Sequence, residues 1–118
     1  MSKIKLKRGD DEQYLVQILQ ENADGSQSSF DLSDTARADL HAKVGGKIEL
    51  QLSTENGSIL WHNRSTGELL LDFAHGLTEN AYWLVADYDL QLIDRNGKRK
   101  TVLSGRIELA HDVTKVSL

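Results

Sequence analysis

The sequence predicts an all-β protein, a sandwich of about seven or eight antiparallel strands with at most one or two short helical turns. Apolar and polar residues alternate in segments of strand length, most clearly from Tyr82 to Ile93. Asn-Gly pairs at Asn56-Gly57 and Asn96-Gly97 separate such segments, which is typical of β-hairpins. The chain has 118 residues, a length that suits one domain. We therefore expect a single domain over residues 1–118.

The first two expected strands run from Lys3 to Lys7 and from Gln13 to Gln20, with a break at Arg8-Gly9-Asp10-Asp11. The second has apolar residues on both faces, as in a well-covered strand. Residues 21–29 are polar and contain glycine, so we expect a loop there. The serine within Asp31–Thr35 is a good helix cap and favours one helical turn.

The strictest alternation lies between Ala36 and Val44. Its alanines favour a helix, but the strict period of two outweighs this weak propensity. The Gly45-Gly46 pair predicts a turn, after which the pattern continues from Ile48 to Leu52. Two further strands are expected over Ser58–His62 and Glu68–Phe73.

The last two expected strands form a hairpin around Asn96-Gly97. A short helical turn at Thr78–Asn80 is expected to precede them and to connect the two sheets. The alternation from Tyr82 to Ile93 predicts that the even-numbered residues point inward, namely Tyr82, Leu84, Ala86, Tyr88, Leu90 and Leu92. The final strand, Arg99–Ala110, is expected to point Leu103, Gly105, Ile107 and Leu109 inward.

Composition and charge exclude several classes of protein. The absence of cysteine excludes disulfides and thiolate metal sites. The formal net charge of −4 is mild, which argues against non-specific nucleic-acid binding. The N-terminal stretch is basic and then acidic without an apolar run, so neither a signal peptide nor a membrane span is predicted.

No catalytic, cofactor or metal site is predicted. The four histidines, at 41, 62, 75 and 111, lack a metal-ligand spacing. The chain has no G-x-S-x-G motif, and its glycines lie in turns rather than in a phosphate-binding loop. Asp87 and Asp89 share one strand face as a possible acid–base or cation pair, but a solvated outer stripe is the favoured interpretation. We expect a protein that is not an enzyme and has no cofactor or small-molecule substrate.

An interface is predicted on the outer surface. If the even-numbered residues after Tyr82 point inward, Trp83 and Val85 must point outward. Leu70 is similarly out of phase with its neighbours Leu69 and Leu71. Exposed apolar side chains of this size often mark partner surfaces, so Trp83 is predicted to anchor a protein–protein contact. The alternative is that a loop or the C-terminal tail covers these residues.

A second hypothesis is carbohydrate binding, because β-sandwiches often present aromatic side chains to glycans. Trp61 and Trp83 are the two tryptophans of the chain. Recognition of a host-surface sugar would require both side chains to be exposed on a common face.

Four motifs carry a family resemblance, at Lys7–Asp10, Asp31–Ser33, Tyr88–Gly97 and Leu103–Thr114. Together they resemble small prophage-encoded proteins of tailed phages. The pattern is also similar, more loosely, to the immunoglobulin-like N-terminal domain of phage baseplate upper proteins.

This resemblance implies an immunoglobulin-like β-sandwich that serves as a tail or baseplate structural protein without catalytic residues. Its implied partners are other phage structural proteins, with homo-oligomerisation as a possibility. The resemblance also implies synthesis in the cytoplasm of a bacterial host and incorporation into the virion.

Overall fold

Ten strands and one short 3₁₀ helix make up the computed structural model, which describes residues 2–111. In chain order these elements are β1 (Ser2–Lys7), β2 (Glu12–Gln17), β3 (Leu19–Glu21), β4 (Gln27–Ser29), β5 (Thr35–Val44), β6 (Lys47–Ser53), β7 (Ile59–Asn63), β8 (Glu68–Phe73), η1 (His75–Leu77), β9 (Val85–Asp94) and β10 (Arg99–Ala110).

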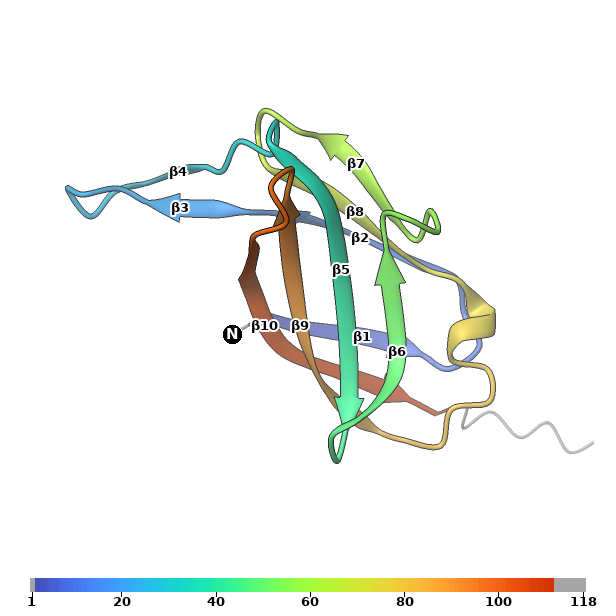
Figure 1. The fold of residues 1–118 in the computed structure, drawn as a ribbon. Coiled ribbons are helices and arrows are strands. Elements are labelled where there is room, and N and C mark those ends of the chain that lie inside the picture. Colours follow the sequence, from blue (N-terminus) through green and yellow to red (C-terminus); the bar gives the residue numbers. More distant parts are fainter. Residues whose placement is uncertain (1, 112–118) are drawn as a thin grey trace, which may run out of the picture.

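The strands form two facing sheets and a separate hairpin (Figure 1). The larger sheet has the order β1-β10-β9-β5-β6, and the smaller sheet has the order β2-β8-β7. All pairs are antiparallel except β1 with β10, which is parallel. In the immunoglobulin fold, strands B, E and D lie in one sheet and strands C, F and G in the other. Here β2, β8 and β7 take the first set of positions and β5, β9 and β10 the second, which confirms the predicted immunoglobulin-like sandwich.

The core lies between the two sheets. The larger sheet contributes alternate residues of its central strands, such as Leu40 of β5 and Leu90 of β9. The smaller sheet contributes Leu69, Leu71 and Phe73 from β8, its central strand. All five side chains are 0–1% exposed. The expected alternation in β5, β8 and β10 is therefore confirmed for most of each strand, because each turns one apolar face toward the opposite sheet. The exception is Ala36, which is exposed because the register shifts between Thr35 and Arg37 at the start of β5.

The main difference from the predicted elements is the β3–β4 hairpin. The strand expected over residues 13–20 is interrupted at the buried Ile18, and the expected loop at 21–29 contains a short hairpin. This hairpin projects away from the sandwich (Figure 1), and the molecule measures 60 × 30 × 27 Å. Its strands have only exposed or half-buried side chains, so no apolar alternation marks them in the sequence.

Neither expected helical turn occurs at its predicted position. Around Asp31, the carboxylate accepts the backbone N–H of Ser33 at 2.9 Å, which forms a tight turn instead of a helix. The turn expected at Thr78–Asn80 follows the 3₁₀ helix η1 rather than forming it. Both deviations occur in connections between strands, where side-chain hydrogen bonds to the backbone determine the conformation.

Candidate docking surfaces

Trp83 lies inside the sandwich, so the predicted outward orientation is wrong. Its side chain is 5% exposed, whereas its neighbours Tyr82 and Leu84 are 69% and 61% exposed. The predicted inward positions of Tyr82 and Leu84 are therefore wrong as well. The cause is that β9 begins at Val85 and not at Tyr82. The strict alternation holds inside the strand and reverses in the connecting segment before it.

Hydrogen bonds hold this connecting segment across the end of the core. The carbonyl of Leu84 accepts the N–H of Leu109 at 2.8 Å, and the carbonyl of Trp83 lies 2.8 Å from Nε2 of His111. Arg8 donates from Nη1 to the carbonyl of Ala81 at 3.4 Å. Trp83 thus closes one end of the core. No glycine or proline marks the start of β9, so no residue in the sequence indicates that the alternation changes phase before Val85. The C-terminal tail from residue 112, predicted as one possible cover, lies outside the described residues.

Val85 and Leu70 point outward, as predicted. Val85 is 45% exposed on the outer face of β9, where it continues the exposed segment formed by Tyr82 and Leu84. Tyr82 donates its hydroxyl to Oε1 of Glu49 at 3.2 Å, which anchors this segment to β6. Leu70 is half-buried on the outer face of β8, opposite the core residues Leu69 and Leu71.

Leu70 belongs to a continuous row of three leucines, which sequence analysis did not identify. Leu70 pairs in register with Leu15 of β2 on one side and with Leu60 of β7 on the other. Leu15 is 55% exposed and Leu60 is 43% exposed, and they flank Leu70 on both sides. We call Leu15, Leu70 and Leu60 the leucine row. Both flanking leucines are out of phase with apolar neighbours, which is the same signal that identified Leu70.

Polar residues border the leucine row on both sides along the strands. Asp72 pairs with Gln13 on one side of the row, and Glu68 pairs with Gln17 on the other. His62 of β7 lies 3.9 Å from the Glu68 carboxylate. The smaller sheet therefore presents an apolar centre with a polar, partly acidic rim, which is the usual anatomy of a protein interface.

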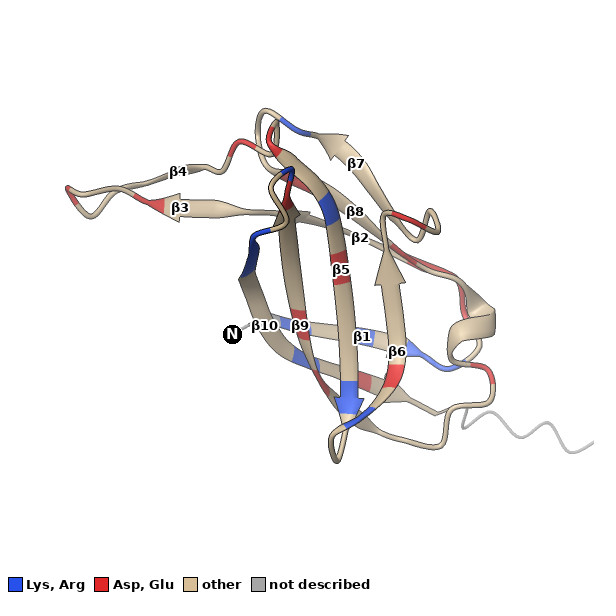
Figure 2. Ribbon diagram, in the orientation of Figure 1, with Lys and Arg blue, Asp and Glu red and all other residues tan. Residues whose placement is uncertain are grey.

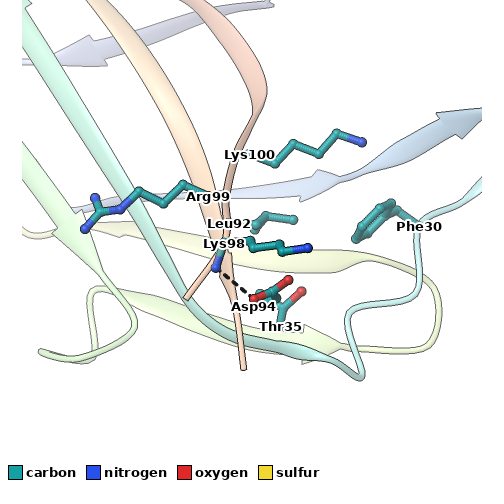
Figure 3. Close-up of a pocket in the computed structure, with 7 residues that line it drawn as sticks. All are labelled: Phe30, Thr35, Leu92, Asp94, Lys98, Arg99 and Lys100. Atoms are coloured by element: carbon teal, nitrogen blue, oxygen red, sulfur yellow. Dashed lines mark hydrogen bonds between the residues drawn. The ribbon is translucent and has the colours of Figure 1, made fainter. Parts of the chain in front are cut away.

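A second surface lies between the β3–β4 hairpin and the β9–β10 turn (Figure 3). Here a cleft of about 330 Å³ is formed by apolar side chains, including Phe30 and Leu92, and by the basic segment Lys98–Lys100. Nζ of Lys100 lies 5.6 Å from the centre of the Phe30 ring. Asp94 stabilises the β9–β10 turn, because its Oδ1 accepts hydrogen bonds from the backbone N–H groups of Asn96 and Lys98 at 2.9 Å each. The cleft is thus apolar at its base and positively charged along one wall.

The two tryptophans do not share an exposed face. Trp61 is half-buried on β7, and the guanidinium of Arg64 lies 3.8 Å from the centre of its ring. Trp83 is in the core. The arrangement that the carbohydrate hypothesis requires is therefore absent.

The titratable residues predicted as candidates lie on polar surfaces. Asp87 lies 3.7 Å from Arg106, and Asp89 accepts a hydrogen bond from Ser104 at 2.7 Å. Both carboxylates are exposed on the outer face of β9, as expected of a solvated stripe. Within residues 2–111, no group of three or more His, Cys, Asp or Glu side chains is arranged to hold a metal ion.

One exposed ion pair has perturbed pKa values. Oδ1 of Asp11 accepts the backbone N–H of His75 at 2.6 Å and lies 3.0 Å from its Nδ1. The backbone hydrogen bond from His75, followed by its side-chain hydrogen bond, lowers the pKa of Asp11. The side-chain hydrogen bond to Asp11 and the Asp11 charge raise the pKa of His75.

Comparisons with known proteins identify a structural neighbour but no family. No protein-family model matches the sequence, and no curated protein does either. A solved structure of Drosophila OTK, extracellular domains 3–5, is similar at 17% sequence identity with a TM-score of 0.41. That match covers 98% of this chain and 34% of the OTK chain, so this chain spans about a third of its length. No helix in the described part of the chain is long and apolar enough to cross a membrane.

Proposed function

We propose that this protein is a non-enzymatic docking module that binds a partner protein through the outer face of its smaller sheet. The leucine row carries this proposal. Leu15 and Leu60 are among the exposed large apolar side chains, and Leu70 joins them into a single strip. Burying a leucine side chain contributes roughly 1.5–3 kcal/mol, so a partner that covers the row gains substantial free energy.

The rim of the row favours a partner of a different kind over a second copy of this chain. In a symmetric dimer, two copies would pack face to face through the leucine row about a two-fold axis at Leu70. Whether that axis runs along β8 or across it, a carboxylate of one copy would lie against a carboxylate of the other. It would bring Asp72 against Asp72 or Glu68 of the other copy, and like charges at close range oppose association. The complementary surface has an apolar centre flanked by Lys or Arg.

The resemblance to prophage-encoded proteins of tailed phages supports a structural or assembly role in the tail or baseplate. The motif residues Tyr88–Asp94 and Leu103–Ala110 lie on β9 and β10, which are central strands of the larger sheet. In such an assembly the larger sheet would maintain the fold, and the smaller sheet would contact the neighbouring structural protein. The partner is then another virion protein.

Photo-crosslinking in a lysate of assembling phage tests this function. A photoreactive amino acid replaces Leu15, at the exposed end of the leucine row, and a matched probe replaces Lys43, exposed on the other sheet. We expect the probe at Leu15 to crosslink one defined tail or baseplate protein, identified by mass spectrometry, and the probe at Lys43 not to crosslink it. Equal labelling from both positions, or labelling of non-virion proteins alone, would contradict the proposal.

A further inference from the structure

Two strand edges lie unpaired beside the second surface. β1 pairs with β10 only from Gly105 to Ala110. Within residues 2–111, the edge of Arg99–Ser104 that faces away from β9 therefore has no partner strand. β3 pairs with β4 on one edge only, so its other edge is also unpaired in the described structure.

A groove separates these two edges. Leu19–Glu21 of β3 and Lys100–Val102 of β10 line the same cleft, which has a volume of about 440 Å³. This cleft shares Phe30 and Lys100 with the cleft of Figure 3, so the two clefts adjoin. We call the hollow between β3 and the first half of β10 the edge groove.

The charge of the edge groove differs from that of the whole chain. The chain has a net charge of −4, yet Lys98, Arg99 and Lys100 are consecutive and exposed. Figure 2 shows this basic segment at the start of β10. None of the three forms an ion pair with a carboxylate in the part of the chain that the structure describes. These cations are therefore available to an acidic ligand.

We infer that the edge groove binds an extended, acidic peptide segment of a partner protein, which adds to β10 as a strand in line with β1. The unpaired backbone groups of Thr101–Ser104 supply the hydrogen bonds of strand addition. Alternate apolar side chains of the peptide pack on Phe30, Leu92 and Val102, and its carboxylates meet Lys98 and Lys100, whose side chains extend toward Phe30 in Figure 3. This inference adds a second docking surface and does not depend on the leucine row.

A peptide fits these features better than a nucleic acid does. Single-stranded nucleic acids bind on aromatic platforms that stack successive bases. The edge groove has one aromatic ring, Phe30, so it cannot stack a series of bases. An unpaired strand edge, in contrast, offers backbone N–H and C=O groups to a peptide, here with one register irregularity between Thr101 and Leu103.

The test uses a capped, fluorescein-labelled peptide that alternates Glu and Val, with affinity measured by fluorescence anisotropy. Amide chemical-shift changes are expected at Leu19–Glu21 and Lys100–Leu103. The double variant Lys98→Glu with Lys100→Glu should bind at least about tenfold more weakly. The control is Lys5→Glu with Lys43→Glu, two exposed positions outside the groove that change the net charge equally. It should change affinity by no more than about twofold, as expected for remote surface charges.

Backbone recognition is tested with two peptide analogues, N-methylated at alternate residues so that each blocks one strand edge. At least one of the two analogues should bind about tenfold or more weakly, because strand addition requires the N–H groups on the peptide edge that faces β10. Three outcomes would overturn the inference: no peptide binding, equal weakening by both double variants, or equal binding of all peptides. Tighter binding of a labelled oligothymidine than of the peptide, abolished by the same Lys98 and Lys100 changes, would assign the groove to nucleic acid instead. Replacing Leu15 and Leu60 by Ser should leave peptide affinity unchanged, which separates this test from that of the proposed function.

Discussion

The two sheets turn similarly apolar inner faces toward the core, but their outer faces differ in chemistry. Across the larger sheet, the in-register residues Lys3, Arg106, Asp87 and Lys43 form a charged row. Across the smaller sheet, the corresponding position is taken by the leucine row. Both rows obey the same period of two along their strands. The period thus determines which residues face outward, while the residue types determine whether that face remains in water.

The difference also concerns the energy of each face. Several ion pairs on the larger sheet are exposed, such as Arg106 with Asp87 at 3.7 Å, and exposed pairs contribute about 0–1 kcal/mol each. Such a face gains little from being covered. The leucine row gains from any apolar cover. A partner is therefore expected on the smaller sheet.

The largest expected effect separates the inner and outer faces of β8. Leu71→Ala empties a fully buried site and should lower the free energy of unfolding by about 3 kcal/mol. Leu70→Ala, one residue away on the outer face, should cost about 1 kcal/mol or less. Urea denaturation followed by tryptophan fluorescence measures both. Equal losses would mean that the outer face is packed like the core, and the contrast between the faces would disappear.

A smaller effect is expected where the smaller sheet supports the β3–β4 hairpin. Gly67, in the β7–β8 turn, has a φ of 76°, and a Cβ there would lie 2.6 Å from the carbonyl oxygens of Ile18 and Phe30. Gly67→Ala should therefore cost about 2 kcal/mol or more in thermal or urea unfolding. Gly57→Ala is the matched control, because Gly57 has a φ of 80° with open space around it. Its cost should be only about 1 kcal/mol. Equal losses would show that backbone strain, not the close approach, sets the effect.

The smallest expected effect on stability comes from the contact between Asp11 and His75, which lie in the two connections that join the sheets. Asp11 lies between β1 and β2, and His75 lies in η1 between β8 and β9. Because the pKa of His75 is raised in the folded state, protonated His75 stabilises the fold. This stabilisation is fully present below the ordinary pKa of 6.5 and is lost as pH rises through the raised value. Because the pKa of Asp11 is lowered, ionised Asp11 also stabilises the fold. This stabilisation is present above pH 3.8 and is lost as pH falls through the lowered pKa. The contact should therefore stabilise the fold most between about pH 4 and 6.5.

An NMR titration of the His75 ring measures this contact. The pKa of His75 should lie above 6.5 and should return toward 6.5 in Asp11→Asn. Asp10→Asn removes an adjacent exposed carboxylate and should leave the pKa of His75 in place. If both variants shift the titration equally, the general negative charge of this loop would be responsible rather than the hydrogen bond.

Periodicity predicted the parts of the fold that bury one strand face. β10 has the predicted bounds, and β5 begins one residue before its predicted start. Each of these strands lies in a sheet with one apolar face, so the alternation in the strand's sequence indicates which side chains face the core. The β3–β4 hairpin buries neither face, and its strands therefore carry no comparable signal.

The candidate surfaces were predicted only in part, for the same reason. Leu70 and Val85 were identified because each is an apolar residue in an outward phase of a true strand. The orientation of Trp83 was misassigned because the chain leaves the strand geometry just before Val85. The leucine row depends on the pairing of three strands, and register between distant strands is a property of the folded sheet.

The position of β10 determines when the protein can fold during its synthesis. This strand is the last one in the described chain, yet it lies between β1 and β9 in the larger sheet. On the ribosome, β1 and β9 cannot find their common neighbour until residues 99–110 have emerged from the exit tunnel. Until then β9 exposes an edge of unpaired backbone N–H and C=O groups, and pairing across nearly the whole chain makes closure of the sheet a late step. A nascent chain stalled before Arg99 should therefore depend on chaperones, whereas the released chain should not.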